Sequence, residues 1–427
     1  MNKSNKIILQ ACFVQGWDKF ILGMLIPILV LFQLDRGLSL IQIGINMATY
    51  SGTVIILEIP SGFLADYFGN KKIYLLSILL NIASMLVLIF AKTNIWITFS
   101  FVLWGSGRAF SSGSLEAIFI NKASFSNNHR NVEKLISYTE FTIPVSLALG
   151  ALLGGFLPDL HVIKMLFIPL SDFYGINFLT ASVFYLGLFI FFSIFVSDTI
   201  YEKEKYSKKD IKPKIIKHSD KKYYSILSIA FSTIKTNSVF FVIMLSSLAW
   251  GFAFSGLETF WQPRVFTITN EIGSTFIYGF LTTGYFLAEA MGSLISWPLC
   301  RLFGNKPYIF LFAQRLLLGG MFLVLSFMSG LGWFSIVYIG LLLFNGMSNP
   351  VEQSVLNRGI PSESRATLLS VISFLMQAGG LIGALSGGIL SEVKGISFTW
   401  QLGGAILILS SFTYLWIYTK KRKNNEL

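Results

Sequence analysis

The chain has 427 residues, of which 54% are hydrophobic and only 13% are charged. A soluble globular domain carries about 25% charged residues, so this composition excludes an ordinary fold surrounded by water. A net charge of +12 is also found in nucleic-acid-binding proteins, but the positions of the charges argue against that function. Two cysteines are too few for a disulfide framework or a cysteine-based metal site.

Apolar segments long enough to cross a bilayer as helices follow one another along the chain. They are residues 7–32, 40–65, 73–91, 95–120, 135–157, 178–196, 239–260, 274–299, 308–328, 333–356, 368–390 and 398–418. Strands of a membrane barrel would be about half as long. We therefore predict an all-α membrane protein with twelve transmembrane helices. An N-terminal bundle (1–196) and a C-terminal bundle (238–427) flank a charged linker (197–237).

The basic residues are distributed unevenly between the two sides of the predicted membrane. Most of the 33 Lys and Arg residues fall in the termini, the linker and the loops on one side, which the positive-inside rule makes cytoplasmic. We expect a multi-pass protein of the cell membrane with both termini in the cytoplasm. The basic excess then reflects topology and contact with anionic membrane lipids, not nucleic-acid binding. Within the linker, residues 223–235 have the pattern of an amphipathic helix on the membrane surface.

Short motifs recur between the two predicted bundles at an offset of about 235 residues. The matches are 69–71 with 304–306, Glu116 with Glu352, and 150–157 with 383–390. They occur in the same chain order and join equivalent spans. The sequence therefore predicts two parallel, pseudo-symmetric six-helix repeats.

The loop after the second span carries a motif made of Gly62, Asp66, Gly69, Lys71 and Lys72. It resembles the loop signature of the major facilitator superfamily. The resemblance implies the major facilitator fold and secondary transport by alternating access. The glycines suit a tight turn, Asp66 can meet a helix N-terminus or a cation, and the lysines can lie at the lipid surface.

Two further motifs resemble those of exporters in that superfamily. Glu58, two residues before a proline and eight before Asp66, resembles a subset of drug efflux proteins that includes a tetracycline type. In the fifth span, Gly150, Gly154 and Gly155 resemble an antiporter signature, with Ala151 at its proline position. The glycines of this motif and of its repeat are Gly150, Gly154, Gly155, Gly383, Gly387 and Gly388. We expect these glycines to have no chemical role and to allow close helix packing.

Charged side chains inside the spans are costly in lipid, so we expect them to face a cavity. The candidates for a proton and substrate cavity are Asp18, Glu58, Arg108, Glu116, Glu289 and Arg315. Arg108 and Glu116 are about 12 Å apart along one helix, so Asp18 is the expected partner of Arg108. Glu289 and Arg315 are expected to pair as a structural lock. Glu140, Glu258 and Glu352 lie near the membrane interfaces, where we expect solvation.

Asp18 and Glu116 allow two interpretations that the sequence leaves open. A carboxylate in a cavity can load a proton, and a nearby arginine opposes this, which makes a switch that substrate can tip. Alternatively, the charges form a permanent ion pair that locks helices together.

The function predicted from these features is proton-coupled export of an amphipathic small molecule. The alternatives are a proton-coupled or facilitative nutrient importer and, in a different class, a membrane sensor or membrane enzyme. We expect no enzymatic activity, no cofactor and no metal, since the three histidines fall in loops. The expected partners are the small-molecule substrate, protons and membrane lipids, with no nucleic acid, and the protein is expected to be a monomer.

Overall fold

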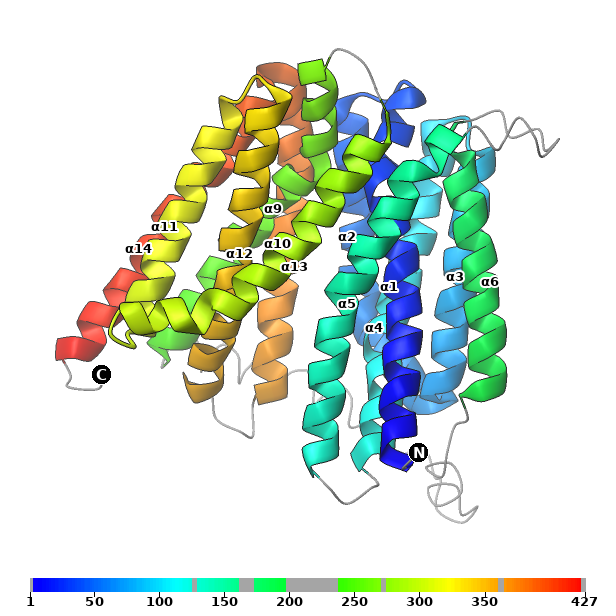
Figure 1. The fold of residues 1–427 in the computed structure, drawn as a ribbon, viewed down its shortest axis with the longest axis horizontal. Coiled ribbons are helices and arrows are strands. Elements are labelled where there is room, and N and C mark those ends of the chain that lie inside the picture. The colour runs from blue at the N-terminus through cyan, green and yellow to red at the C-terminus, as the bar shows by residue number, and fades with distance from the viewer. Residues whose placement is uncertain are drawn as a thin grey trace.

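The computed structural model describes residues 3–124, 129–160, 173–196, 237–269, 274–359 and 365–423. Within these ranges the chain is almost entirely helical (Figure 1). The elements are α1 (Lys3–Asp35), α2 (Leu40–Phe68), α3 (Asn70–Phe90), α4 (Asn94–Ser124), α5 (His129–Phe156), the short 3₁₀ helix η1 (Pro158–Leu160), α6 (Gly175–Phe195), α9 (Ser238–Thr269), α10 (Phe276–Leu302), α11 (Pro307–Ser326), α12 (Leu331–Gly359), α13 (Arg365–Lys394) and α14 (Ile396–Lys423). The amphipathic helix predicted at 223–235 lies outside the described residues.

Each predicted span corresponds to one long α-helix of the described chain. Helices suit these segments because lipid offers no hydrogen bonds to backbone groups, and a helix satisfies them internally. Ten of the described helices are long and apolar enough to cross a membrane, and α4 and α10 are the long helices outside this set. α4 carries Arg108 and Glu116, and α10 carries Glu289. Charged side chains such as these lower the hydropathy of both helices.

The helices form two groups, α1–α6 and α9–α14, which lie side by side (Figure 1). The same pairs pack within each group: α1 on α5 as α9 on α13, α2 on α4 as α10 on α12, and α3 on α6 as α11 on α14. This correspondence agrees with the sequence repeat. The predicted fold class, an all-α protein built from two matched six-helix bundles, is confirmed.

Glycines bring the paired helices of each half into backbone contact. A Cβ added to Gly150 or Gly154 would lie 2.1 Å or 2.0 Å from a carbonyl oxygen of α1. A Cβ added to Gly383 would lie 2.3 Å from the carbonyl oxygen of Phe252 on α9. At these distances no side chain fits, so each glycine allows α5 to approach α1, or α13 to approach α9, more closely than any other residue would.

The two halves meet along α2 with α13 and along α5 with α10, which are the same pair exchanged by the repeat. A Cβ added to Gly155 of α5 would lie 2.5 Å from the Cα of Gly279 on α10. A Cβ added to Gly44 of α2 would lie 3.0 Å from the Cα of Gly388 on α13. These contacts lie near the end of the bundle opposite to the N- and C-termini. We call this end the far face, and the end with the termini the near face.

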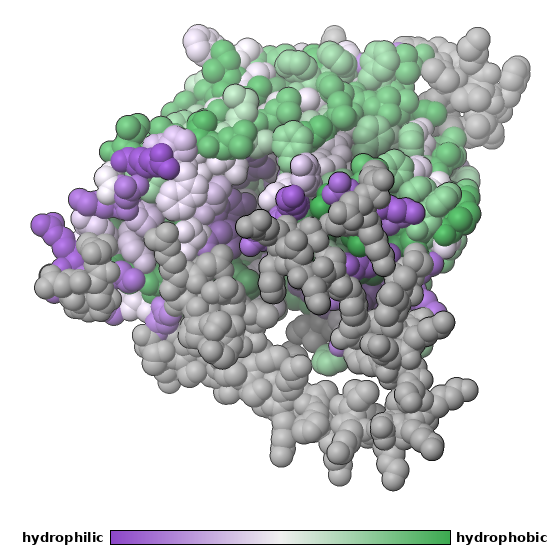
Figure 2. Space-filling model, turned by 60° about the horizontal axis from the view of Figure 1, so that its bottom comes forward, coloured by the Kyte–Doolittle hydropathy of each residue, from purple (hydrophilic) through white to green (hydrophobic). Residues whose placement is uncertain are grey.

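Polar and apolar residues occupy different parts of the protein surface. Hydrophobic residues cover the flank of the bundle, and hydrophilic residues gather on the near face (Figure 2). Large apolar side chains such as Leu294, Phe90 and Ile95 are 77–78% exposed, which suits contact with lipid and not with water. The buried core within each half contains many aromatic side chains, including Trp400, Tyr74 and Phe119.

Candidate functional site

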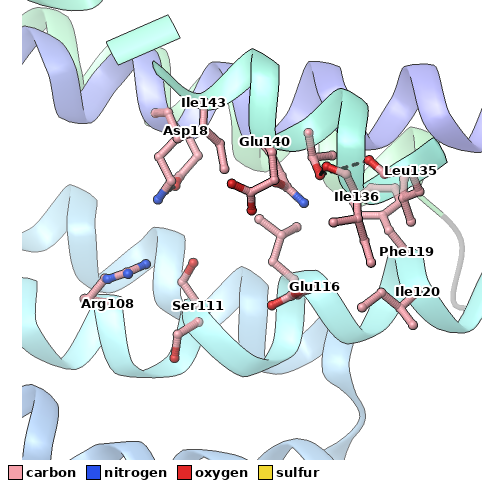
Figure 3. Close-up of a pocket in the computed structure, with 15 residues that line it drawn as sticks. Asp18, Arg108, Ser111, Glu116, Phe119, Ile120, Leu135, Ile136, Glu140 and Ile143 are labelled. Atoms are coloured by element: carbon pink, nitrogen blue, oxygen red, sulfur yellow. Dashed lines mark hydrogen bonds and ion pairs between the residues drawn. The ribbon is translucent and has the colours of Figure 1, made fainter. Parts of the chain in front are cut away.

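A cavity of about 270 Å³ lies between α1, α4 and α5, in the part of these helices nearer the near face (Figure 3). Its polar lining consists of Gln15, Asp18, Lys19, Arg108, Ser111, Ser112, Glu116, Thr139 and Glu140. Its apolar lining consists of Leu115, Phe119, Ile120, Leu135, Ile136 and Ile143. The site therefore combines charged groups with an apolar wall.

Helical spacing brings these side chains together. On α1 the lining residues fall at 15, 18 and 19, and on α4 they recur at 108, 111, 112, 115, 116, 119 and 120. On α5 they fall at 135, 136, 139, 140 and 143. Steps of three and four residues keep side chains on one face of a helix. Each helix thus presents one continuous stripe to the cavity.

Asp18 is paired with its sequence neighbour. Lys19 Nζ lies 3.4 Å from Asp18 Oδ2, and the two side chains are 17% and 12% exposed. Arg108 points into the cavity from α4 (Figure 3) and makes no ion pair with a described residue. The expected Asp18–Arg108 pair is therefore wrong: Lys19 is the ion-pair partner of Asp18, and Arg108 is a cation in the cavity that pairs with no residue the structure describes.

Glu116 and Glu140 project into the cavity from α4 and α5 (Figure 3). Both are exposed to solvent within it, and neither forms a hydrogen bond or ion pair with any residue that the structure describes. The expectation that Glu140 is a solvated interfacial residue misses its place in the cavity. The helical stripe through Ile136, Thr139 and Ile143 was the sequence signal that could have placed it there.

Comparison with known proteins identifies the family. A model described as Major Facilitator Superfamily matches residues 11–265 and 262–427. The chain belongs to this superfamily. As a member of it, the protein is a secondary transporter that crosses the membrane several times.

Two relatives of this transporter span nearly its full length. It is 23% identical over 416 residues to the MFS-type transporter YxaM of Bacillus subtilis, covering 95% of this chain and 94% of that one. It is 22% identical over 401 residues to the MFS-type transporter MJ1560 of Methanocaldococcus jannaschii, covering 92% and 93%. These relatives support the superfamily, and the likeness to tetracycline efflux proteins remains a prediction.

Solved structures share the transporter's fold at low sequence identity. The nucleoside transporter NupG superposes with a TM-score of 0.75 at 10% identity, over 98% of this chain and 99% of that one. A bacterial homologue of the human lysosomal transporter Spinster, in an inward-facing and occupied conformation, gives 0.73 at 12% identity, over 96% of both chains. At such identities the likeness shows the fold alone.

The transporter's other predicted charges lie outside this cavity. Arg315 Nη2 lies 3.6 Å from Glu352 Oε2 and donates a hydrogen bond of 2.8 Å to Ser246 Oγ. The Tyr414 hydroxyl donates a hydrogen bond to Glu352, and its oxygen lies 2.8 Å from Ser246 Oγ. The expected Glu289–Arg315 pair is wrong, as is simple solvation of Glu352. A buried ion pair holds α11 to α12 instead, with α9 and α14 contributing hydrogen bonds.

Glu289 belongs to a second polar group formed by α9, α10 and α12. Asn345 donates a hydrogen bond to Glu289, and Trp250 Nε1 donates to Asn345 Oδ1 at 2.8 Å. Nearby, Tyr285 donates to Glu258 Oε1 at 2.7 Å. These partners could not be predicted from the sequence, because Asn345 and Tyr285 carry no charge and lie more than 25 residues from the acids they bind.

Glu58 is half-buried on α2 and does not line the cavity. In the loop motif that follows it, Gly69 has a φ of 92°, a conformation that favours glycine. Lys71 Nζ donates to the carbonyl oxygen of Ser193 at 3.0 Å, near the end of α6, so it does not simply lie at the lipid surface. Asp66 and Lys72 are exposed, as is Gly62.

No group of three His, Cys, Asp or Glu side chains capable of holding a metal ion occurs in the described parts of the chain. The cavity itself presents several charged groups. Two carboxylates and a guanidinium that pair with no described residue, together with one ion pair, face a shared space beside apolar side chains. Such a site can exchange protons and bind an amphipathic molecule.

Proposed function

We propose that this transporter exports an amphipathic small molecule in exchange for protons. The observation that carries the proposal is a pair of carboxylates, Glu116 and Glu140, that bind none of the described residues and share one cavity with Arg108 and the Asp18–Lys19 pair. A proton and a cationic group neutralise a carboxylate equally well, so the two compete for the same side chains. Binding of one therefore favours release of the other, which is the requirement for exchange.

The lining of the cavity supports an amphipathic substrate. Phe119, Ile120 and Ile143 supply apolar lining beside the charged groups. A volume of about 270 Å³ is close to the lower end of the range for small-molecule sites. A small molecule with an apolar body and a basic group would place the body on this lining and the basic group between Glu116 and Glu140.

The far face is closed in this state, which fits the loading step of an exporter. The cavity lies toward the near face, and the tight contacts between the halves lie toward the far face. The near face carries Lys71, Lys72 and the basic end of α14, which supports a cytoplasmic location. In the proposed export cycle, this state loads substrate from the cytoplasm, and rocking of the two halves releases it outside.

The same proposal includes the organisation of the chain. Residues 1–196 and 238–427 are the two moving bundles, and residues 197–237 are the cytoplasmic linker between them. The transporter acts as a monomer in the cell membrane, with its basic near face against anionic lipids.

Transport in proteoliposomes tests the exchange mechanism. Purified protein is reconstituted with a pH-sensitive dye inside, a pH gradient is imposed, and lipophilic amines are added. Substrate movement should dissipate the gradient in the wild type, and in Glu116→Gln and Glu140→Gln it should fall at least tenfold. Glu133→Gln is the matched control, because Glu133 is an exposed acid of α5 outside the cavity. Full proton-coupled transport in the double variant Glu116→Gln/Glu140→Gln would overturn the proposal.

Import of a nutrient by proton symport is the second candidate, since the same carboxylates can load proton and substrate together. The two candidates differ in the direction of coupling. In exchange, substrate moves in the direction opposite to the protons, and in symport it moves in the same direction as the protons. Measuring radiolabelled substrate in vesicles with the acid side inside and then outside distinguishes them.

A further inference from the structure

Two carboxylates at the far face, Asp159 and Glu392, bind the start of a helix in the opposite half. Asp159, in η1 after α5, accepts hydrogen bonds from the backbone N–H groups of Thr275 (3.2 Å) and Phe276 (3.1 Å). It also accepts from the hydroxyls of Thr275 (2.9 Å) and Ser274. Glu392, at the end of α13, accepts from the backbone N–H of Leu40 at 2.8 Å. Both acids thus connect one half of the transporter to the other.

The two contacts are related by the internal repeat. Asp159 follows Gly155 by four residues, and Glu392 follows Gly388 by four residues. Gly155 and Gly388 are the glycines of α5 and α13 that touch the opposite half. Four residues are about one helical turn. In both interfaces a close glycine contact is therefore followed, one turn farther out, by an acid at the N-terminus of the neighbouring helix.

The two helices that receive these acids differ in how they begin. α2 has its own capping box, in which Ser39 and Gln42 satisfy each other's backbone N–H groups. In α10, the N-cap residue Thr275 makes no such side-chain hydrogen bond. The free N–H groups at a helix start need acceptors, and Asp159 supplies them for α10. From its own half, the start of α10 receives a 3.3 Å hydrogen bond from the Phe276 N–H to Ser274 Oγ. α10 therefore takes most of its cap from the opposite half, whereas Glu392 adds to a cap that α2 already has.

The electrostatics favour a charged Asp159. Its carboxyl group accepts hydrogen bonds from Ser274, Thr275 and Phe276, and such bonds favour the charged form of a carboxyl group. The positive end of the α10 dipole acts in the same direction. Asp159 is thus an anion held at the positive end of a helix in the other half.

We propose that Asp159 and Glu392 form a pair of latches that hold the far face closed, with Asp159 the stronger. Opening the far face separates α5 from α10 and α13 from α2, so both carboxylates lose their donors and α10 loses most of its cap. The closed state is stabilised relative to the open state by these bonds. The latches act on the equilibrium between the two states and do not depend on the substrate, the coupling ion or the direction of transport.

Distance measurements between spin labels test the latches. Labels at Thr93→Cys and Ser329→Cys, in a variant lacking Cys12 and Cys300, report on the two halves at the far face. Both positions are exposed and lie in turns away from the latches. Asp159→Ala should raise the ratio of open to closed far face about fivefold, the factor expected for loss of a helix cap. Glu392→Ala should raise it less, and the double variant should raise it most.

Two further variants test whether the charge and the position of Asp159 account for the effect of its removal. Asp159→Asn keeps an oxygen acceptor but removes the charge, so its effect should fall between the wild type and Asp159→Ala. Asp35→Ala is the matched control, because Asp35 is an exposed acid at the far end of α1 that binds no described residue of the other half. An unchanged distance distribution in the folded double variant, or an equal shift in Asp35→Ala, would overturn the proposal. If Asp159→Ala does not fold, Asp159→Asn and Glu392→Ala decide by the same criteria.

Discussion

Glu116 and Glu352 occupy equivalent positions in the two halves of the transporter, yet their surroundings differ. Glu116 is exposed in the cavity and lacks a described partner. Glu352 is bound by Arg315 and Tyr414. The same position in a duplicated fold is therefore available for binding in one half and used for packing in the other.

The difference is due to one neighbouring helix. Arg315 lies on α11, and the repeat places Leu80 of α3 at the corresponding position. α3 has no cation beyond Lys71 and Lys72 in its first turn, so no basic side chain is supplied to Glu116. Pseudo-symmetry of the backbone thus does not impose symmetry on the charges, and a single residue decides which carboxylate remains free.

The largest expected effect comes from breaking the buried pair. Arg315→Met leaves Glu352 without its cation in a site where Arg315 is only 2% exposed, and loss of one partner of a buried pair costs about 3–5 kcal/mol of unfolding free energy. Arg108→Met should cost less than about 1 kcal/mol, because Arg108 is exposed and unpaired. Denaturant titration of both variants in detergent measures the difference. Equal losses would contradict the division between the two halves.

Glycine substitutions sharpen the comparison at repeat-related positions. A Cβ at Gly154 would lie 2.0 Å from the backbone oxygen of Met24, whereas one at Gly387 would lie 3.0 Å from a ring carbon of Phe260. A ring can shift more easily than a helix backbone. Gly154→Ala should therefore destabilise the protein by about 1–3 kcal/mol, and Gly387→Ala by clearly less. Melting temperatures in one detergent test this order, and a larger effect of Gly387→Ala would contradict it.

Substitution of Glu116 should affect transport more than stability, whereas substitution of Glu352 should affect stability more than transport. Glu116→Gln should lower proton-coupled transport per folded molecule at least tenfold, about 1.4 kcal/mol, without loss of stability. Glu352→Gln should lower the yield of folded protein but leave transport per folded molecule within about twofold, since Glu352 does not line the cavity. Rates normalised to protein recovered in vesicles provide the measurement. Similar rates for the two variants would remove Glu116 from the mechanism.

The sequence was sufficient for the parts of the molecule that depend on local or repeated patterns. Apolar length predicted every long helix, and the motif matches predicted the two related halves. Charge pairing could not be predicted in the same way. The packing of α10, α11 and α12 determines whether Glu289 or Glu352 lies near Arg315, and this packing is not a local feature of the sequence. The glycines of α5 indicated close contact but not its partners, which are α1 for Gly154 and α10 for Gly155.

The smallest expected effect concerns the basic residues of the repeated loop motif. Lys71 donates to the carbonyl oxygen of Ser193 near the end of α6, where a cation is favoured by the helix dipole and by free carbonyl groups. Its repeat counterpart, Lys306, is exposed and forms no side-chain hydrogen bond with a described residue. Lys71→Met should therefore cost about 0.5 kcal/mol and Lys306→Met should have no measurable effect. Thermal unfolding of the two variants in the same detergent checks this, and equal stability would mean that the contact at α6 contributes nothing.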